Sequence, residues 1–182
     1  MKVAVIGLAS SSFEAAPWDD PTWQKWGLPW GMRWIQLDRA FEMHDLGLLR
    51  RPESRRPKGY EERLQLIPDL YMQEAYFPNA KRYPFEEVIE TTGDYFNSSI
   101  SYLIALAIHE GAETIGLWGV DMDAEEEYGY QRPNCEYLIG LARGMGINVV
   151  IPDVSPLCKF NGHEIPLGDM KPTYPRRYGC LT

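Results

Sequence analysis

Residues 98–151 read SSISYLIALAIHEGAETIGLWGVDMDAEEEYGYQRPNCEYLIGLARGMGINVVI, and this stretch decides the fold class. Serine residues that can cap a helix precede the first apolar segment, and glycines follow each of the two helical segments. The pattern predicts, in order, a helix over 100–109, a strand over 114–118, a helix over 133–144 and a strand over 147–151. Helices that alternate with strands through short links imply parallel strands joined by right-handed crossovers.

The remainder of the chain supports the same architecture. Residues 2–6 form an apolar run that stops at Gly7, which is typical of a central parallel strand covered on both faces. Further strands are predicted over 22–28, 40–43 and 70–73, and shorter helices over 13–16, 33–37, 60–66 and from 83. We therefore predict an α/β, three-layer Rossmann-like fold, with a mostly parallel sheet and helices on both faces. Residues 1–158 should form a single domain, and 159–182 an extended C-terminal tail.

Composition and charge exclude several classes of function. The formal net charge of −8 repels a phosphate backbone, so we expect no general nucleic-acid binding. No apolar run reaches the roughly 18 residues that a membrane span needs, so no membrane partner is expected. The three cysteines are widely spaced and odd in number, as is typical of reduced thiols, which predicts a cytoplasmic protein.

Polar residues follow each of the predicted strands, and this convergence predicts a ligand site. In open parallel sheets, ligands bind beyond the carboxyl ends of the strands. The loop over 7–12 (GLASSS) has neither GxGxxG nor a Walker lysine, but serine hydroxyls and backbone N–H groups there can bind a phosphate. The alternative is a plain strand-to-helix turn with capping serines. The other strand ends are HD at 44–45, GVD at 119–121 and PDVS at 152–155.

Three of these side chains are candidates for the chemistry. The carboxylate of Asp121 can accept ribose hydroxyls or bind a metal ion, or it can cap a turn. The planar fork of Arg132 suits phosphate or carboxylate, or it is an exposed arginine beside packing tyrosines. His44 can act as a general base oriented by Asp45, although neighbours on a strand face opposite ways, and a polar strand end is the alternative.

The sequence allows two alternative roles for each of two charged segments. The acidic run over 121–127 suits Mg²⁺ or a solvated surface, and we predict neither a dedicated metal site nor a bound organic cofactor. Residues 49–59 hold five basic residues and two prolines, which predicts an exposed loop that does not pack. That loop either closes over a phosphorylated ligand or only improves solubility.

Four short segments occur in an order known from other proteins: IGLASS at 6–11, a helix over 99–107, ETIGLWGVD at 113–121 and GINVVIP at 146–152. This layout resembles the Rossmann-like family of small bacterial sialyltransferases, motility-associated glycosyltransferases and archaeal hydroxymethylpterin pyrophosphokinases. Residues 18–28 together with 128–141 are similar to small proteins encoded by tailed phages or prophages, which would place the protein in a bacterial host cell. The resemblance spans about residues 1–158.

The resemblance implies a site for a nucleotide or nucleotide sugar and a transferase activity. The positions that match those around the nucleotide are Gly7, Ser10, Ser11, Asn97, Ser98, Gly119 and Asp121, and Tyr128 and Tyr130 match active-site tyrosines of the sialyltransferases. This chain departs from the relatives at Ala9 and Ser10, where they have glycine and proline, and near Pro29, where they have asparagine. The relatives' catalytic histidine lies in a lid that we expect this shorter chain to lack. A non-catalytic nucleotide binder and a structural or partner-binding protein are therefore the alternatives, and an oligomer is left open.

Overall fold

The computed structural model describes residues 1–54, 56–122 and 128–159. These residues form one seven-stranded sheet in the order β5-β4-β3-β2-β1-β6-β7, and every neighbouring pair of strands is parallel. The strands are β1 (Lys2–Ile6), β2 (Trp23–Gly27), β3 (Arg39–Glu42), β4 (Leu70–Met72), β5 (Ala80–Arg82), β6 (Thr114–Trp118) and β7 (Asn148–Val150).

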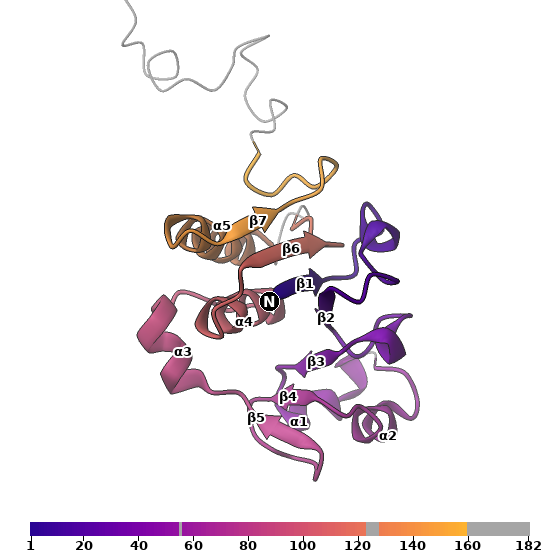
Figure 1. The fold of residues 1–182 in the computed structure, drawn as a ribbon. Coiled ribbons are helices and arrows are strands. Elements are labelled where there is room, and N and C mark those ends of the chain that lie inside the picture. Colours follow the sequence, from indigo (N-terminus) through magenta and orange to yellow (C-terminus); the bar gives the residue numbers. More distant parts are fainter. Residues whose placement is uncertain (55, 123–127, 160–182) are drawn as a thin grey trace, which may run out of the picture.

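Helices cover both faces of this sheet, as Figure 1 shows. One face carries the longer helices α3 (Phe85–Thr92), α4 (Ser99–His109) and α5 (Tyr128–Gly144). The other face carries short elements, namely α1 (Leu46–Leu49), α2 (Tyr60–Gln65) and the 3₁₀ turns η1 (Phe13–Ala15), η2 (Trp34–Gln36) and η3 (Pro52–Ser54). The predicted three-layer α/β Rossmann-like fold is therefore confirmed.

Strand β1 lies in the middle of the core because its side chains are apolar on both faces. Val3 and Val5 pack into the cluster that contains α4 and α5, whereas Ala4 and Ile6 pack against Phe13 and other residues of the opposite layer. All four strand residues are at most 2% exposed. This two-sided burial explains why the strand is a continuous apolar run rather than an alternating one.

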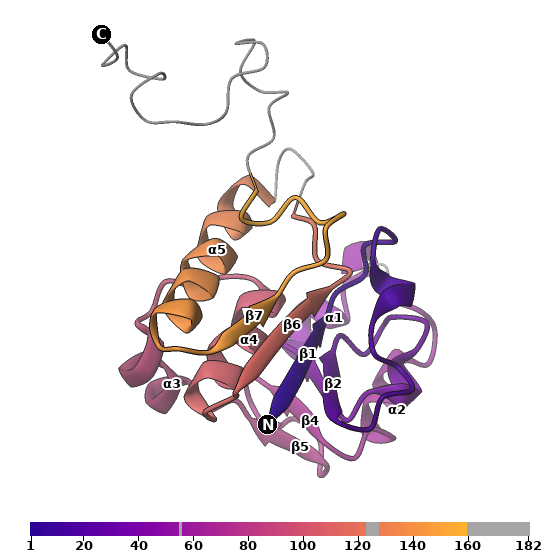
Figure 2. The ribbon, with the colours of Figure 1, turned by 45° about the horizontal axis from the view of Figure 1, so that its top comes forward.

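The direction of the strand order reverses at β1. From β1 the chain proceeds outward to β5 on one side, and then returns through α3 and α4 to β6 and β7 on the other side (Figure 2). The carboxyl ends of β1 and β6 therefore flank the topological switch point of the sheet. In folds of this kind, that is where ligands bind.

Helix α4 begins with a capping box, which confirms the predicted cap. The Ser98 hydroxyl accepts a hydrogen bond from Ser101 N at 3.1 Å, and the Ser101 hydroxyl accepts one from Ser98 N at 2.9 Å. Ser98→Ala should lower the free energy of unfolding by about 1 kcal/mol, because an orphan N–H of the first turn loses its acceptor. Urea denaturation measures this loss. Ser99→Ala, beside the box, is the control, and an equal loss in both variants would show that the cap is not its source.

Three predictions about local structure are corrected. Helix α5 begins at Tyr128 rather than at Pro133, so the proline lies inside the helix and removes one backbone donor there. Strand β5 was not predicted, because it is a three-residue edge strand with two basic side chains. The segment 49–59 does pack in part: Leu49 is 7% exposed and the side chain of Arg56 is 14% exposed. Of the tail predicted over 159–182, residues 160–182 lie outside the described residues.

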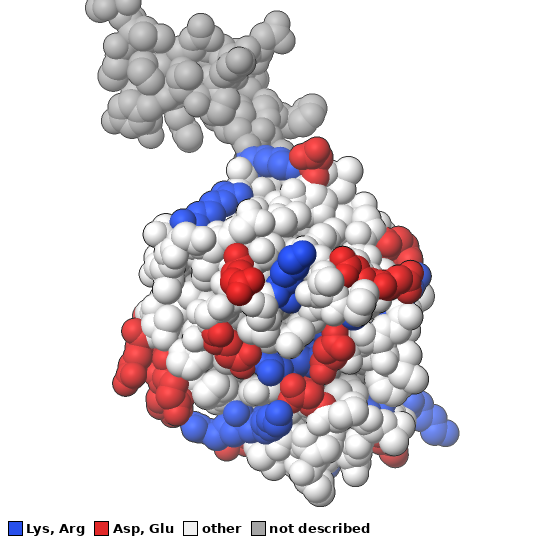
Figure 3. All heavy atoms as spheres, in the orientation of Figure 1, with Lys and Arg blue, Asp and Glu red and all other residues white. Residues whose placement is uncertain are grey.

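The surface of the described residues carries both signs of charge. On the face shown in Figure 3, acidic and basic side chains are interspersed rather than segregated. Several charged side chains of the described residues form ion pairs, among them Arg39 with Asp69 and with Glu110. In the described part of the chain, no helix has the length and apolar character that crossing a membrane requires.

Candidate functional site

Two loops that the sequence placed at strand ends meet in the structure. The hydroxyl of Ser11, after β1, donates a hydrogen bond of 2.8 Å to the carboxylate of Asp121, after β6. The neighbouring Ser12 is buried, and its hydroxyl accepts a hydrogen bond of 2.8 Å from Gly119 N. Residues 110 positions apart thus form one rim at the switch point.

Because Gly7 and Gly119 have no side chains, the two strand ends come close enough for direct hydrogen bonds between their backbones. Gly7 N donates to Trp118 O at 2.8 Å, and Ala9 N donates to Gly119 O at 2.9 Å. A Cβ atom on Gly7 would lie 2.3 Å from Gly119 O, and Gly119 itself has a φ of +64°. Both predicted positions therefore need glycine for structural reasons. Ser10 and Ser11 are the exposed serines of this loop.

A third loop, after β7, joins the same rim. Ser155 is 1% exposed, and its hydroxyl donates to Val120 O at 2.9 Å. Arg132, on α5, is directed toward the chain after β7: its Nε donates to Glu136 at 2.9 Å and an Nη donates to Pro156 O at 2.7 Å. Two nitrogens of the guanidinium predicted to bind phosphate are thus occupied within the fold: Nε pairs with Glu136 on the same helix, and one Nη links α5 to this loop.

The predicted site residues near the start of α4 differ in whether their side chains are available to a ligand. The Ser98 hydroxyl is committed to the helix cap and lies 3.7 Å from the Cys135 sulfur of α5, so it faces the interior. Burial raises the pKa of the Cys135 thiol to about 12, which keeps it protonated. Asn97 has an exposed side chain. Tyr128 begins α5, but the side chains of Tyr128 and Tyr130 and the acidic residues 123–127 lie outside the described part.

His44, at the end of β3, has a carboxylate partner that sequence reasoning missed. Its Nδ1 lies 2.5 Å from an oxygen of Glu42, whereas the predicted partner Asp45 caps α1 by accepting from Gly47 N at 2.7 Å. The signal in the sequence was the E-x-H spacing: Glu42 ends β3, and His44 follows two residues later with its ring against the carboxylate.

Glu42 is a buried charge, and the side chains of three residues hold it. It is 2% exposed, and its second oxygen accepts from the Tyr60 hydroxyl and lies 3.5 Å from the Arg56 guanidinium. Burial alone would raise the pKa of Glu42, but the hydrogen bonds from His44 and Tyr60 and the charge of Arg56 lower it overall. Glu42 is therefore ionised in the folded protein.

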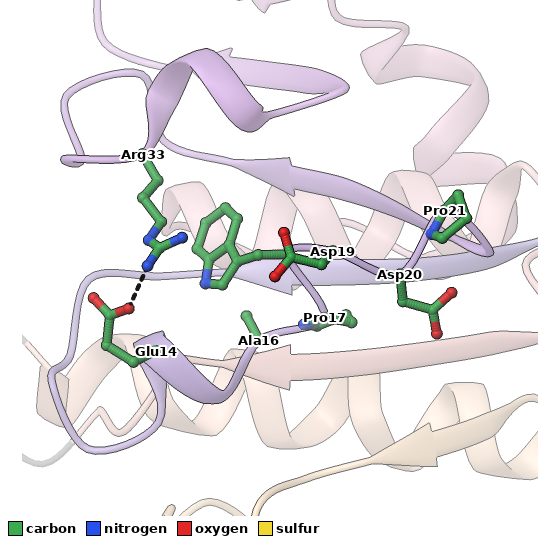
Figure 4. A pocket seen from close by; sticks show the side chains of 8 residues that line it. Glu14, Ala16, Pro17, Asp19, Asp20, Pro21 and Arg33 are labelled. Carbon is green, nitrogen blue, oxygen red and sulfur yellow. Dashed lines mark hydrogen bonds and ion pairs between the residues drawn. The ribbon is translucent and has the colours of Figure 1, made fainter.

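An open hollow lies beside the rim, on the face that carries η1 (Figure 4). Arg33 and Glu14 form an ion pair of 2.7 Å at one end, while Asp19 and Asp20 lie toward the other. The three carboxylates repel a phosphate, and among the described residues that line the hollow the one basic side chain, Arg33, is already paired. The hollow is thus less suited to a phosphorylated ligand than the rim is.

The side chains in the described part of the chain include no group of three or more His, Cys, Asp or Glu residues that could hold a metal ion. The acidic run considered for Mg²⁺ falls mostly on residues 123–127, outside that part.

Comparison with solved structures finds a similar fold in the sialyltransferase CstII from Campylobacter jejuni. Against its complex with the substrate analogue CMP-3FNeuAc, the TM-score is 0.55 at 14% identity, over 85% of this chain and 80% of that chain. Against its complex with cytidine-5'-monophosphate, the TM-score is 0.54 at 16% identity, over 86% and 79%. No family model matches the chain, and no curated protein matches it in sequence. The sialyltransferase-like fold is thereby confirmed.

Proposed function

We propose that this chain binds a nucleotide sugar, or another activated nucleotide donor, at the switch point between β1 and β6 and transfers the activated group. The observation that carries the proposal is the contact between Ser11 and Asp121, which joins two loops at the edge where such sheets bind ligands. The fold is shared with a sialyltransferase whose solved complexes contain CMP and a CMP-sugar analogue.

The rim supplies the groups that such a donor needs. The exposed Ser10 offers a hydroxyl donor to the phosphate, whereas the one hydroxyl proton of Ser11 is already donated to Asp121. Asp121 accepts one hydrogen bond from Ser11, and a carboxylate has about four acceptor positions, so ribose hydroxyls can share it. Asn97 offers an exposed amide at the start of α4. Arg132 contributes through its hold on the loop after β7.

Asp121→Ala should weaken nucleotide binding roughly 10- to 100-fold, because a hydrogen bond to a charged acceptor contributes about 1.5–3 kcal/mol. Isothermal calorimetry with CMP, UDP, GDP and their sugar conjugates measures this. The matched control is Asp19→Ala, an exposed aspartate in the hollow of Figure 4, which should bind as the wild type does. Weakening by Asp19→Ala but not by Asp121→Ala would move the site to the hollow.

Chromatography of the same mixtures shows whether the donor is consumed. Release of free nucleotide, with the sugar passed to water or an added acceptor, supports a transferase. Binding without consumption supports a non-catalytic nucleotide binder instead. The absence of binding at millimolar nucleotide would contradict both functions.

A further inference from the structure

We propose that His44 is the general base that deprotonates the acceptor hydroxyl, and that Glu42 is the residue that positions it. The inference rests on the proposed transferase function. It adds the residues that activate the acceptor hydroxyl, which the rim does not supply.

The charge state of Glu42 determines which nitrogen of His44 carries a proton. An ionised carboxylate can only accept hydrogen bonds, so the 2.5 Å contact requires a proton on His44 Nδ1. In the neutral imidazole the lone pair then resides on Nε2. The His44 side chain is 48% exposed, so a substrate can reach this ring. A histidine with one nitrogen bound to a carboxylate and the other free is the arrangement that general-base catalysis uses.

The surroundings of Glu42 hold the pair in one geometry. The carboxylate also receives the His44 backbone N–H at 3.2 Å and the Tyr60 hydroxyl, which comes from α2. Arg56 lies 3.2 Å from His44 Nδ1, and its guanidinium stacks over Trp30 at 5.0 Å. A protonated Nδ1 cannot accept from this arginine, whose guanidinium instead forms an ion pair of 3.5 Å with the Glu42 carboxylate.

A buried charged cluster of this kind is poorly explained by stability alone. Moving charges out of water is costly, and well-packed apolar side chains in the same volume are often as stable or more stable. The described residues also leave Arg56 Nε buried without a hydrogen-bond partner. Perturbed, partnered titratable groups at a strand end are instead characteristic of functional sites.

The position in the sheet brings His44 within reach of the proposed donor. Strand β3 is parallel to β2, and β2 to β1, so their carboxyl ends lie on the same edge. With strands about 4.8 Å apart, the ends of β3 and β1 are roughly 10 Å from each other. A nucleotide held at β1 and β6, with its sugar extended toward β3, would place the reacting carbon between the rim and His44.

The step balances without a further reactant. The acceptor hydroxyl gives its proton to His44 Nε2, and the oxygen electron pair forms the bond to the sugar carbon. The bond from that carbon to the phosphate oxygen breaks, and the nucleotide leaves with the electron pair. The imidazolium, stabilised by Glu42, then returns its proton to water.

The test uses His44→Gln and Glu42→Gln, with His109→Gln in α4 as the matched control, since His109 is paired with Thr91 away from this cluster. Loss of a general base should lower kcat by roughly 10²- to 10⁴-fold, with the calorimetric Kd for the nucleotide sugar changed less than about twofold. His109→Gln should keep the wild-type kcat. A retained kcat in His44→Gln overturns the proposal.

Nitrogen-15 NMR of the imidazole tests Glu42 independently of turnover. The wild type should show the Nδ1–H tautomer for His44, and Glu42→Gln should abolish that preference. If Glu42→Gln does not fold, Tyr60→Phe keeps the carboxylate while removing one of its donors, and should lower kcat with Kd unchanged. An Nε2–H tautomer in the wild type overturns the pairing.

These readouts separate the two proposals. If the wild type binds no nucleotide, the proposed function fails, and the NMR result still decides the tautomer. If the wild type binds nucleotide sugars and consumes none of them, binding at the rim stands and the role of His44 as a base is overturned.

Discussion

The Gly7→Ala variant should lose about 3 kcal/mol or more of its free energy of unfolding. The added Cβ would lie 2.3 Å from Gly119 O, a backbone atom that cannot rotate away. The two strand ends would have to separate, weakening the hydrogen bonds from Gly7 N and Ala9 N. Overpacking typically costs 1–3 kcal/mol, and each lost hydrogen bond about 1 kcal/mol more. Urea denaturation followed by circular dichroism measures the total.

Gly140→Ala is the matched control for this substitution. Gly140 lies within α5, and a Cβ there would meet nothing within 4 Å. The same chemical change should therefore raise stability, by about 0.5–1 kcal/mol, because alanine favours the helix and restricts the unfolded chain. A Gly7→Ala variant within about 0.5 kcal/mol of the wild type would contradict the close approach of the two loops.

The core of the sheet could be predicted from the sequence because buried parallel strands have a distinctive local sequence pattern. β1 and β6 are apolar runs that end at glycine, and each of those glycines sits at the crossing of the two strand ends. β5 carries no such signal, since an edge strand of three residues buries little surface. The first turns of α5 were missed because a proline inside a helix looks like its beginning.

The rim could be predicted, but not the partners of its side chains. Parallel topology alone brings the carboxyl ends of β1 and β6 together, so the nearness of Ser11 and Asp121 follows from the fold. The acceptor of Arg132 lies 24 positions away on the carbonyl of Pro156, and no local pattern indicates it. The Glu42 and His44 pair could have been predicted, because the two residues lie only two positions apart where β3 ends.

Glu42→Ala should lower the free energy of unfolding by about 3–5 kcal/mol, since it leaves the Arg56 guanidinium, whose side chain is only 14% exposed, without its counter-charge. Acid should have a related effect on the wild type. The pKa of Glu42 is lower in the folded than in the unfolded protein, so its contribution is present above the unfolded value of about 4.3 and is lost as the pH falls through the folded value. Urea midpoints between pH 7 and pH 3 measure this loss, and in Glu42→Gln the decline should be shallower.

A triple variant separates the stability of this cluster from its chemistry. Replacing Glu42 and Arg56 by leucine and Tyr60 by phenylalanine removes every buried charge at once and leaves none without a partner. Because the cost of Glu42→Ala comes from an orphaned charge, the triple variant should recover most of the lost stability. It should nevertheless lack turnover, since no carboxylate then fixes the proton on His44 Nδ1. A triple variant as unstable as Glu42→Ala would mean that the cluster is retained for the fold, whereas a stable variant that keeps full turnover would remove Glu42 from the mechanism.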